Sequence, residues 1–223
     1  MSGLAADPAD LVVDRLACRR SERLVFQGLS CVLPPGGALL LTGANGSGKS
    51  SLLRLLATLL TPAAGMVTWA GAPVARDLAR YRANLHYVGH LDAIKPALGV
   101  AETLAFWTEM RGWPTSGIVA ALDAFALEAV ADWPCRWLSA GQRRRLALAR
   151  LIAAPAPVWL LDEPTAALDA DGERRLITAI ERHRAAGGRV VIATHQALGL
   201  ADAQYLVLED FAPAEGEPIA SET

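Results

Sequence analysis

The sequence predicts an α/β fold with a parallel core sheet, an antiparallel β subdomain and an inserted helical subdomain. Short continuous apolar runs at residues 38–41, 158–161 and 190–193 indicate strands buried on both faces, as in a parallel sheet. A glycine-rich loop at residues 43–48 separates the first run from an apolar helix. The order strand, loop, helix is the start of an α/β core.

The other elements follow from apolar runs and from the glycines and prolines that end them. Further strands are expected at residues 11–13, 24–26, 66–69 and 205–208. Helices are expected from residue 51 to before Pro62, across a helical stretch at 100–136, and at about 142–153 and 172–186. We expect one domain over residues 1–208, with the helical subdomain at about 97–137, and a mobile acidic tail over residues 209–223.

Composition excludes several classes of protein. The 223 residues suit one large domain, and 52% apolar against 20% charged residues is far from the pattern of disorder. The net charge of −2 provides no cationic field for nucleic acid. We therefore expect no nucleic-acid partner.

Signals for membrane insertion, secretion and metal binding by cysteine are missing from the sequence. The longest apolar run, residues 151–161, contains Pro155 and Pro157 and is shorter than the ~20 residues that cross a bilayer. The N-terminus lacks the basic and apolar regions of a secretory signal. Three cysteines without a CxxC pair indicate reduced thiols. We expect the protein to stay in the cytosol.

The glycine-rich loop matches the phosphate-loop pattern GxxxxGK[ST], and it lies between a strand and a helix, as that motif requires. Glycines let backbone N–H groups converge on phosphate oxygens, a lysine adds a point charge, and a serine hydroxyl can bind Mg²⁺. A glycine-rich turn that binds nothing would not need the Lys-Ser pair at this offset. The expected phosphate-binding residues are Gly43, Ala44, Asn45, Gly46, Ser47, Gly48, Lys49, Ser50 and Ser51.

An acidic pair, Asp162 and Glu163, closes the apolar run at residues 158–161. Ligands bind at the carboxyl edge of such a sheet. Asp162 would join Ser50 in holding Mg²⁺, and Glu163 would orient or deprotonate an attacking water. Acids often end buried strands as solvated groups, so this reading depends on the phosphate loop nearby.

Residues 138–142, Leu-Ser-Ala-Gly-Gln, resemble the LSGGQ signature of the ATP-binding-cassette family, with Ala140 as the departure. The loop at residues 167–169 and His195 after a buried run stand in the family's order and rough spacing. The resemblance covers nearly the whole chain and implies a P-loop ATPase domain that uses ATP and Mg²⁺. Ser139 can equally serve as the N-cap of the next helix.

The resemblance also implies a head-to-tail homodimer that sandwiches each ATP between two chains. In that arrangement, His195 contacts the γ-phosphate and holds water near Glu163. The residues expected to act on the partner chain's ATP are Ser139, Gly141, Gln142 and Asp169.

Three positions depart from the family pattern. Arg20 stands where the family stacks an aromatic side chain on adenine, and a guanidinium plane can also stack on a base. His90 stands where the family has glutamine, and it can bond water or reach Mg²⁺. Ala166 replaces the usual serine before the loop at 167–169.

Residues 87–90, 138–151, 159–164 and 193–196 together resemble the ATP-binding subunits of the haem exporter of cytochrome c maturation. That subfamily implies membrane permease partners, an indirect haem-chaperone partner and a place at the cytoplasmic face of the bacterial inner membrane. Whether hydrolysis moves haem or releases a loaded chaperone stays open. Trp107 and Trp113 are either permease anchors or core packing.

Two alternatives remain. One is the ATPase subunit of another small-molecule transporter of the same family. The other is a soluble P-loop kinase, which would gain nothing from a water-activating glutamate. A GTPase is excluded because the chain has no NKxD motif.

Overall fold

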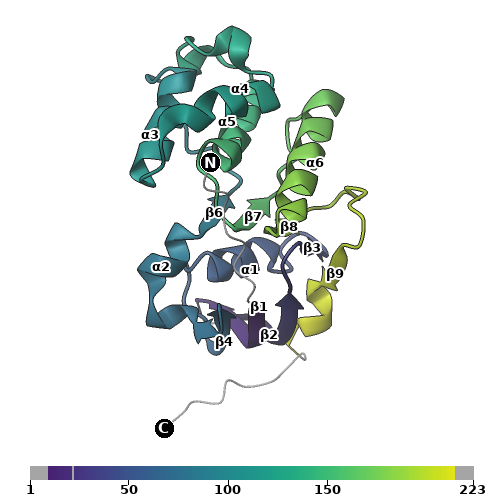
Figure 1. Ribbon diagram of the computed structural model, residues 1–223. Helices are drawn as coiled ribbons and strands as arrows, with labels where there is room; N and C mark the ends of the chain where they lie inside the picture. The colour runs from purple at the N-terminus through teal and green to yellow at the C-terminus, as the bar shows by residue number, and fades with distance from the viewer. Residues whose placement is uncertain (1–9, 22, 214–223) are drawn as a thin grey trace.

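The structure is a computed structural model that describes residues 10–21 and 23–213. It contains a five-stranded parallel sheet and a four-stranded antiparallel sheet (Figure 1). The parallel order is β6 (Leu85–Val88), β7 (Val158–Asp162), β8 (Arg189–Ala193), β3 (Ala38–Thr42) and β9 (Gln204–Val207). The antiparallel order is β2 (Arg23–Leu33), β1 (Leu11–Arg20), β4 (Ala64–Trp69) and β5 (Ala72–Pro73).

The parallel sheet is buried on both faces, as its apolar runs predict. Along β3, Leu39 and Leu41 point into one hydrophobic core, whereas Ala38 and Leu40 point into another. β7 and β8 alternate in the same way. Two cores therefore lie on opposite sides of one sheet, as in a layered α/β domain.

The described residues form six α-helices. They are α1 (Lys49–Leu56), α2 (Leu78–Ala83), α3 (Val100–Met110), α4 (Ile118–Ala124), α5 (Ala140–Ala153) and α6 (Ala170–Ala185). The leucines of α1 pack in the core shared with the antiparallel sheet, while α5 and α6 contribute to the other core. Short 3-10 helices lie at Val74–Arg76, Thr115–Gly117, Glu128–Val130, Cys135–Trp137 and Leu208–Phe211.

The helical segment between β6 and α5 leaves and re-enters the core at one place. The backbone N–H of Val100 donates to the carbonyl of Trp133 at 3.0 Å, and that of Cys135 donates to Leu98 at 2.8 Å. α3 and α4 pack on α5, so that the three helices form the upper part of Figure 1.

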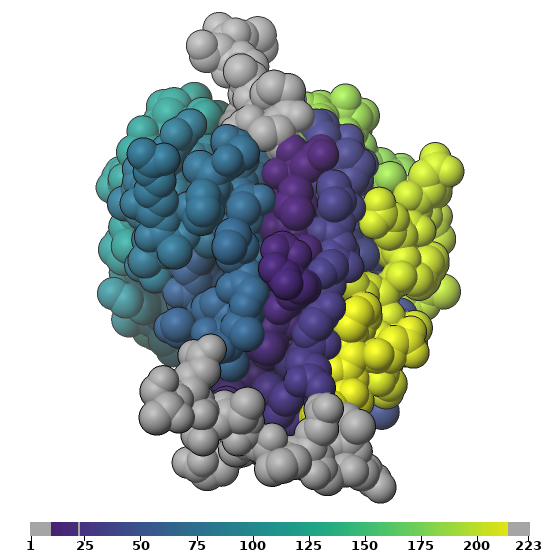
Figure 2. All heavy atoms as spheres, turned by 90° about the horizontal axis from the view of Figure 1, so that it is seen from below, coloured from purple at the N-terminus to yellow at the C-terminus, as the bar shows by residue number. Residues whose placement is uncertain are grey.

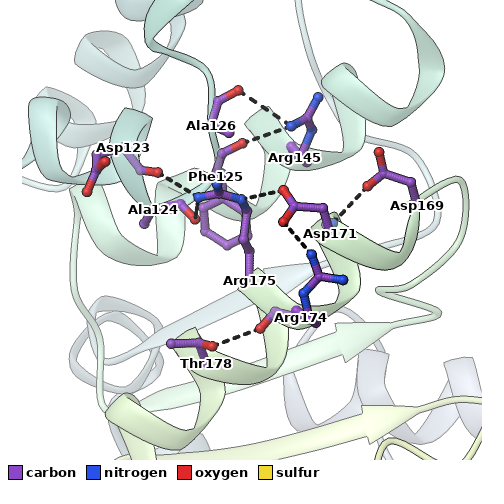
Figure 3. A network of polar contacts seen from close by, with 11 residues as sticks. Asp123, Ala124, Phe125, Ala126, Arg145, Asp169, Asp171, Arg174, Arg175 and Thr178 are labelled. Carbon is purple, nitrogen blue, oxygen red and sulfur yellow. Dashed lines mark hydrogen bonds and ion pairs between the residues drawn. The ribbon is translucent and has the colours of Figure 1, made fainter.

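Polar contacts join the end of α4 to α5 and α6 (Figure 3). Arg175 of α6 donates to the carbonyls of Asp123 and Ala124 and pairs with Asp171 at 2.7 Å. Arg145 of α5 donates to the carbonyls of Phe125 and Ala126 at 3.4 and 3.5 Å. The helical segment is thus attached to the core through backbone carbonyls at the end of α4.

The strands β5 and β6 and the helix α2 were not expected from the sequence. β6 contains His86 within a four-residue edge strand, and α2 is a six-residue helix capped by Asp77, whose carboxylate accepts from Arg80 N. β1 and β2 also extend beyond the runs at 11–13 and 24–26. Short or polar elements of this kind carry too few apolar residues for a clear periodic pattern.

The boundary expected after residue 208 falls inside the last 3-10 helix, Leu208–Phe211. Phe211 packs against the core that α1 shares with the antiparallel sheet, and this helix lies beside β2. Figure 2 shows the face made by β1 and β2, with the yellow segment that ends at residue 213 alongside. Residues 214–223 of the expected tail lie outside the described residues. Within the described part of the chain, no helix combines the length and apolar character needed to cross a bilayer.

Candidate nucleotide site

The phosphate loop joins β3 to α1 with its glycines in backbone conformations that L side chains avoid. Gly43, Gly46 and Gly48 have φ of 132°, 85° and 109°. A Cβ at Gly48 would also lie 2.8 Å from Cγ1 of Val25. Glycine at position 48 is therefore required by conformation and by packing, and this places the loop at the N-terminus of α1.

Lys49 and Ser50 begin α1 and point back toward the loop and the sheet. The buried Lys49 ammonium donates to the carbonyls of Gly43 and Ala44 at 2.7 and 3.0 Å. Ser50 Oγ donates to Oδ1 of Asp162 at 3.0 Å. A serine hydroxyl beside a carboxylate supplies the oxygen ligands that Mg²⁺ prefers, so these two side chains fit a Mg²⁺ site.

A cavity of about 420 Å³ opens over the loop. It brings together the end of β1, the loop, and residues after β7 and β8, which the sequence had placed in one site. The lining residues are Arg20, Val25, Asn45, Gly46, Gly48, Lys49, Ser50, Ser51, Glu163 and His195. A glycine loop with a cation at the bottom and polar groups on the rim fits the phosphates of a nucleotide.

Val25 lines the cavity although the sequence had not singled it out. The hairpin pairs Arg20 with Arg23 across the turn between β1 and β2, which brings Val25 to the same edge as Arg20. Strand pairing around Arg20 could have located it, since both residues lie near one hairpin turn.

Glu163 and His195 face each other beside this cavity. His195 Nε2 lies 3.2 Å from Glu163 Oε1, with side chains 47% and 28% exposed. Glu163 has φ of 46°, and its N–H donates to the carbonyl of Ala193 at 2.9 Å. Left-handed backbone is unusual for a non-glycine residue and is found at functional sites. The pair is placed to act on a group above the phosphate loop.

His90 follows β6 on an exposed segment and is not among the residues that line the cavity. The cavity lining also does not include Ser139, Gly141, Gln142 or Asp169. Asp169 is the N-cap of α6 and accepts from Gly172 N at 2.8 Å.

Ser139 caps α5, as one reading of the sequence expected. Its Oγ accepts from Gln142 N at 3.1 Å, while Gln142 Oε1 accepts from Ser139 N at 2.9 Å. This reciprocal pair is a capping box. The Ser139 hydroxyl acts here as an acceptor, which leaves its O–H available to donate to another group.

Glu209, which the sequence had assigned to the tail, contacts the phosphate loop. Its carboxylate accepts from the N–H of Ala44 in the phosphate loop. This bond lowers the pKa of Glu209, and the nearby Lys49 charge adds to the effect. An acidic side chain thus holds the first turn of the loop, and a Cβ at Gly43 would collide with it.

Comparison with known proteins identifies the family. Residues 26–166 match the ABC transporter family, which is more than half of the chain. The chain belongs to this family. The match confirms the resemblance noted in the sequence and favours an ABC ATPase over a P-loop kinase.

Two relatives of this ABC protein carry the same name. The chain is 57% identical over 212 residues to the "Cytochrome c biogenesis ATP-binding export protein CcmA" of Rhodospirillum rubrum, covering 95% of the chain and 91% of the relative. It is 51% identical over 207 residues to the protein of that name from Paramagnetospirillum magneticum, covering 91% and 95%.

Solved ABC structures show the same fold. A putative ABC transporter ATP-binding protein from Pyrococcus furiosus superposes with a TM-score of 0.81 at 21% identity, covering 92% of this chain and all of that one. At this identity, the likeness concerns the fold alone. The expected class, an ABC-type domain with a parallel core sheet, an antiparallel sheet and helices, is confirmed.

Proposed function

We propose that this chain is the ATP-hydrolysing subunit of an ABC transporter that serves cytochrome c biogenesis. The observation that carries the hydrolysis is the pairing of Glu163 with His195 at 3.2 Å on the rim of the phosphate-loop cavity. The names of the relatives support the assignment to cytochrome c biogenesis. The proposed substrates are ATP and water, with Mg²⁺ as the cofactor.

Lys49 and the loop N–H groups bind the phosphates in this proposal. Lys49 would release the carbonyls of Gly43 and Ala44 and donate to phosphate oxygens instead. Ser50 and Asp162 would hold Mg²⁺, which when bound neutralises charge on the phosphates. Arg20 lines the same cavity and would stack on the base.

Glu163 would act as the general base toward a water at the γ-phosphate. His195 shares a contact with its carboxylate, so the imidazole can hold that carboxylate in place and donate to the phosphate. Both side chains are partly exposed to the cavity, which gives water a route to them.

The other half of each site would come from a second copy of the chain. Ser139, Gly141 and Gln142 lie at the N-terminus of α5, where helix N–H groups favour an anion. The free O–H of Ser139 can donate to the γ-phosphate of the partner's ATP. Asp169 and His90 would take part at the dimer interface and at the bound water or Mg²⁺, respectively.

The proposed partners are membrane permease subunits, with a haem chaperone as an indirect partner. The proposed location is the cytoplasmic face of the bacterial inner membrane. Hydrolysis would then either move haem or release a haem-loaded chaperone. The ATPase subunit of another small-molecule ABC transporter is the competing assignment, and the first test below does not depend on which is right.

The test of hydrolysis is Glu163→Gln, with Glu181→Gln on the exposed face of α6 as the matched control. Loss of a general base lowers turnover by about 10²- to 10⁴-fold. We expect this loss in Glu163→Gln, with ATP binding retained and a dimer accumulating in the presence of ATP. Glu181→Gln should keep the parent turnover. Equal turnover in the two variants would contradict the role of Glu163.

The test of the transporter assignment uses the same trapped variant. Glu163→Gln is purified from membranes with ATP, and co-purifying chains are identified by mass spectrometry. Recovery of two small permeases and a haem chaperone is the expected result. Recovery of an unrelated permease would keep the ATPase and overturn the link to cytochrome c biogenesis.

A further inference from the structure

Arg144 of α5 is a buried cation that joins three segments of the fold. Its residue is 3% exposed, and its guanidinium makes five hydrogen bonds. The acceptors are the carbonyls of Gly89, Asp162, Glu163 and Pro164, at 2.9, 2.8, 2.8 and 3.2 Å, and Oδ1 of Asp92, at 3.1 Å. A guanidinium has five N–H donors, so each donor can have one acceptor.

These acceptors belong to two segments at the carboxyl ends of the neighbouring parallel strands β6 and β7. Gly89 and Asp92 belong to the loop after β6, while Asp162 ends β7 and is followed by Glu163 and Pro164. Asp92 supplies the opposite charge that a buried cation requires, and its side chain is 24% exposed. Arg144 therefore connects α5, the loop after β6 and the backbone of Glu163.

Arg144 contacts Glu163 at a residue whose backbone conformation is unfavourable for an L-amino acid. Glu163 has φ of 46°, a conformation that the surrounding structure must hold in place. Three hydrogen bonds hold the backbone of this residue: its N–H donates to the carbonyl of Ala193, and its carbonyl accepts from Arg144 Nη2 and from the N–H of Ala166. The carboxylate reaches His195 from this fixed backbone.

We infer that Arg144 is a positioning residue for Glu163, and that it transmits the placement of α5 and of the loop at residues 89–92 to the Glu163 carboxylate. The inference rests on the proposed role of Glu163 in hydrolysis. Any shift of α5 against the sheet must move the guanidinium, and with it the carbonyls of Asp162 and Glu163. The five hydrogen-bond acceptors of Arg144 include none of the residues that would bind the phosphates directly.

Arg144→Lys tests this inference, because an ammonium keeps the charge but has three donors for five acceptors. Arg145→Lys is the matched control on the same helix, since Arg145 makes only two bonds of 3.4 and 3.5 Å at the end of α4 (Figure 3). A displacement of about 1 Å at a reacting group can cost about 10²-fold in rate. We expect kcat of Arg144→Lys to fall by roughly ten- to a hundredfold.

In Arg144→Lys, kcat should fall by a larger factor than the KM for ATP changes, because the carboxylate of Asp162 stays bonded to Ser50. Arg145→Lys should keep both the parent kcat and the parent KM. A kcat of Arg144→Lys equal to that of the control would overturn the inference. Asp92→Asn provides a second variant if Arg144→Lys does not fold. It leaves the four carbonyl bonds and removes only the ion pair, and we expect a smaller fall in kcat.

Hydrogen exchange of the full chain without nucleotide separates this inference from the proposed function. In Arg144→Lys, amides at residues 89–92 and 162–166 should exchange faster than in Arg145→Lys. Ala166 N is a direct reporter, because it donates to the carbonyl of Glu163 at 3.1 Å. Unchanged exchange there would overturn the positioning role, even if the parent chain hydrolyses ATP. A parent chain without hydrolysis would instead contradict the proposed function.

Discussion

Two buried histidines should make the fold sensitive to mild acid. His86 of β6 donates from Nε2 to the carbonyl of Ala154, and burial, with Arg111 and Arg150 nearby, lowers its pKa to about 3. His183 of α6 stacks on Trp159 with ring centroids 3.8 Å apart, and burial lowers its pKa to about 4. Both imidazoles are therefore neutral in the folded chain near neutral pH.

The direction and size of the pH effect on stability follow from the difference in histidine pKa between the folded and unfolded chain. In the unfolded chain each imidazole titrates near 6.5, which is above its folded pKa. The stability is fully present above pH 6.5 and is lost as the pH falls from 6.5 toward the folded values. At about pH 5, roughly 1.5 pH units below the pKa of the unfolded chain, each histidine lowers the free energy of unfolding by about 2 kcal/mol, because each pH unit contributes about 1.36 kcal/mol. Together they remove about 4 kcal/mol, a large share of the about 5–15 kcal/mol of a typical domain.

The assay is urea unfolding followed by tryptophan fluorescence from about pH 7.5 to 5. His86→Gln and His183→Gln are the perturbations, because the glutamine amide can keep a donor near the imidazole Nε2 position but takes up no proton in this range. In each variant, the fall in the free energy of unfolding between pH 7.5 and 5 should be smaller than in the parent by about half of the part due to the two histidines. The exposed-site control His90→Gln should show the same fall as the parent. A parent-like pH slope in both buried variants would refute the reasoning.

Three further outcomes are expected. Lys49→Ala should weaken ATP binding measured by calorimetry, because it removes a charge-assisted contact with phosphate, and an unchanged affinity would argue against the site. His90→Gln should retain ATP hydrolysis, because the amide also bonds water, whereas a large loss would show that the imidazole is needed. Ser139→Ala should lower stability by about 1 kcal/mol through the lost helix cap and also lower hydrolysis, and chemical unfolding beside an ATPase assay would separate these two effects.

The core of the fold could be predicted because its strands are unusual in sequence. The runs at residues 38–41, 158–161 and 190–193 have no polar interruption, and the structure buries them on both faces. β6 was not predicted because His86 interrupts its apolar pattern. The burial of His86 is explained by a hydrogen bond to the carbonyl of Ala154 that only the folded chain provides. Local pattern cannot reveal a partner 68 positions away in the chain.

The candidate site was predictable to a similar degree. The phosphate loop, Asp162 and Glu163 were found because each stands at the end of a buried strand or before a helix, whereas His195 was found only through the family resemblance. Glu209 was missed because an acidic residue near a chain end usually signals a solvated tail, and its contact with Ala44 depends on β9 lying beside β3. Arg144 gave no signal of its own because it stands between two other arginines, and its five acceptors lie outside α5.

The two ends of the helical segment lie side by side, so the segment can be exchanged between relatives. The backbone bonds from Val100 to Trp133 and from Cys135 to Leu98 bring the chain back to its starting point, so the two junctions already lie side by side. Closing a chain whose ends are held together costs little conformational entropy, even when its length changes. Exchange of residues 99–134 between relatives should therefore leave the strand order of the core intact. What a donor segment must match is the face of α5 and the two arginines, Arg145 and Arg175, that receive the end of α4.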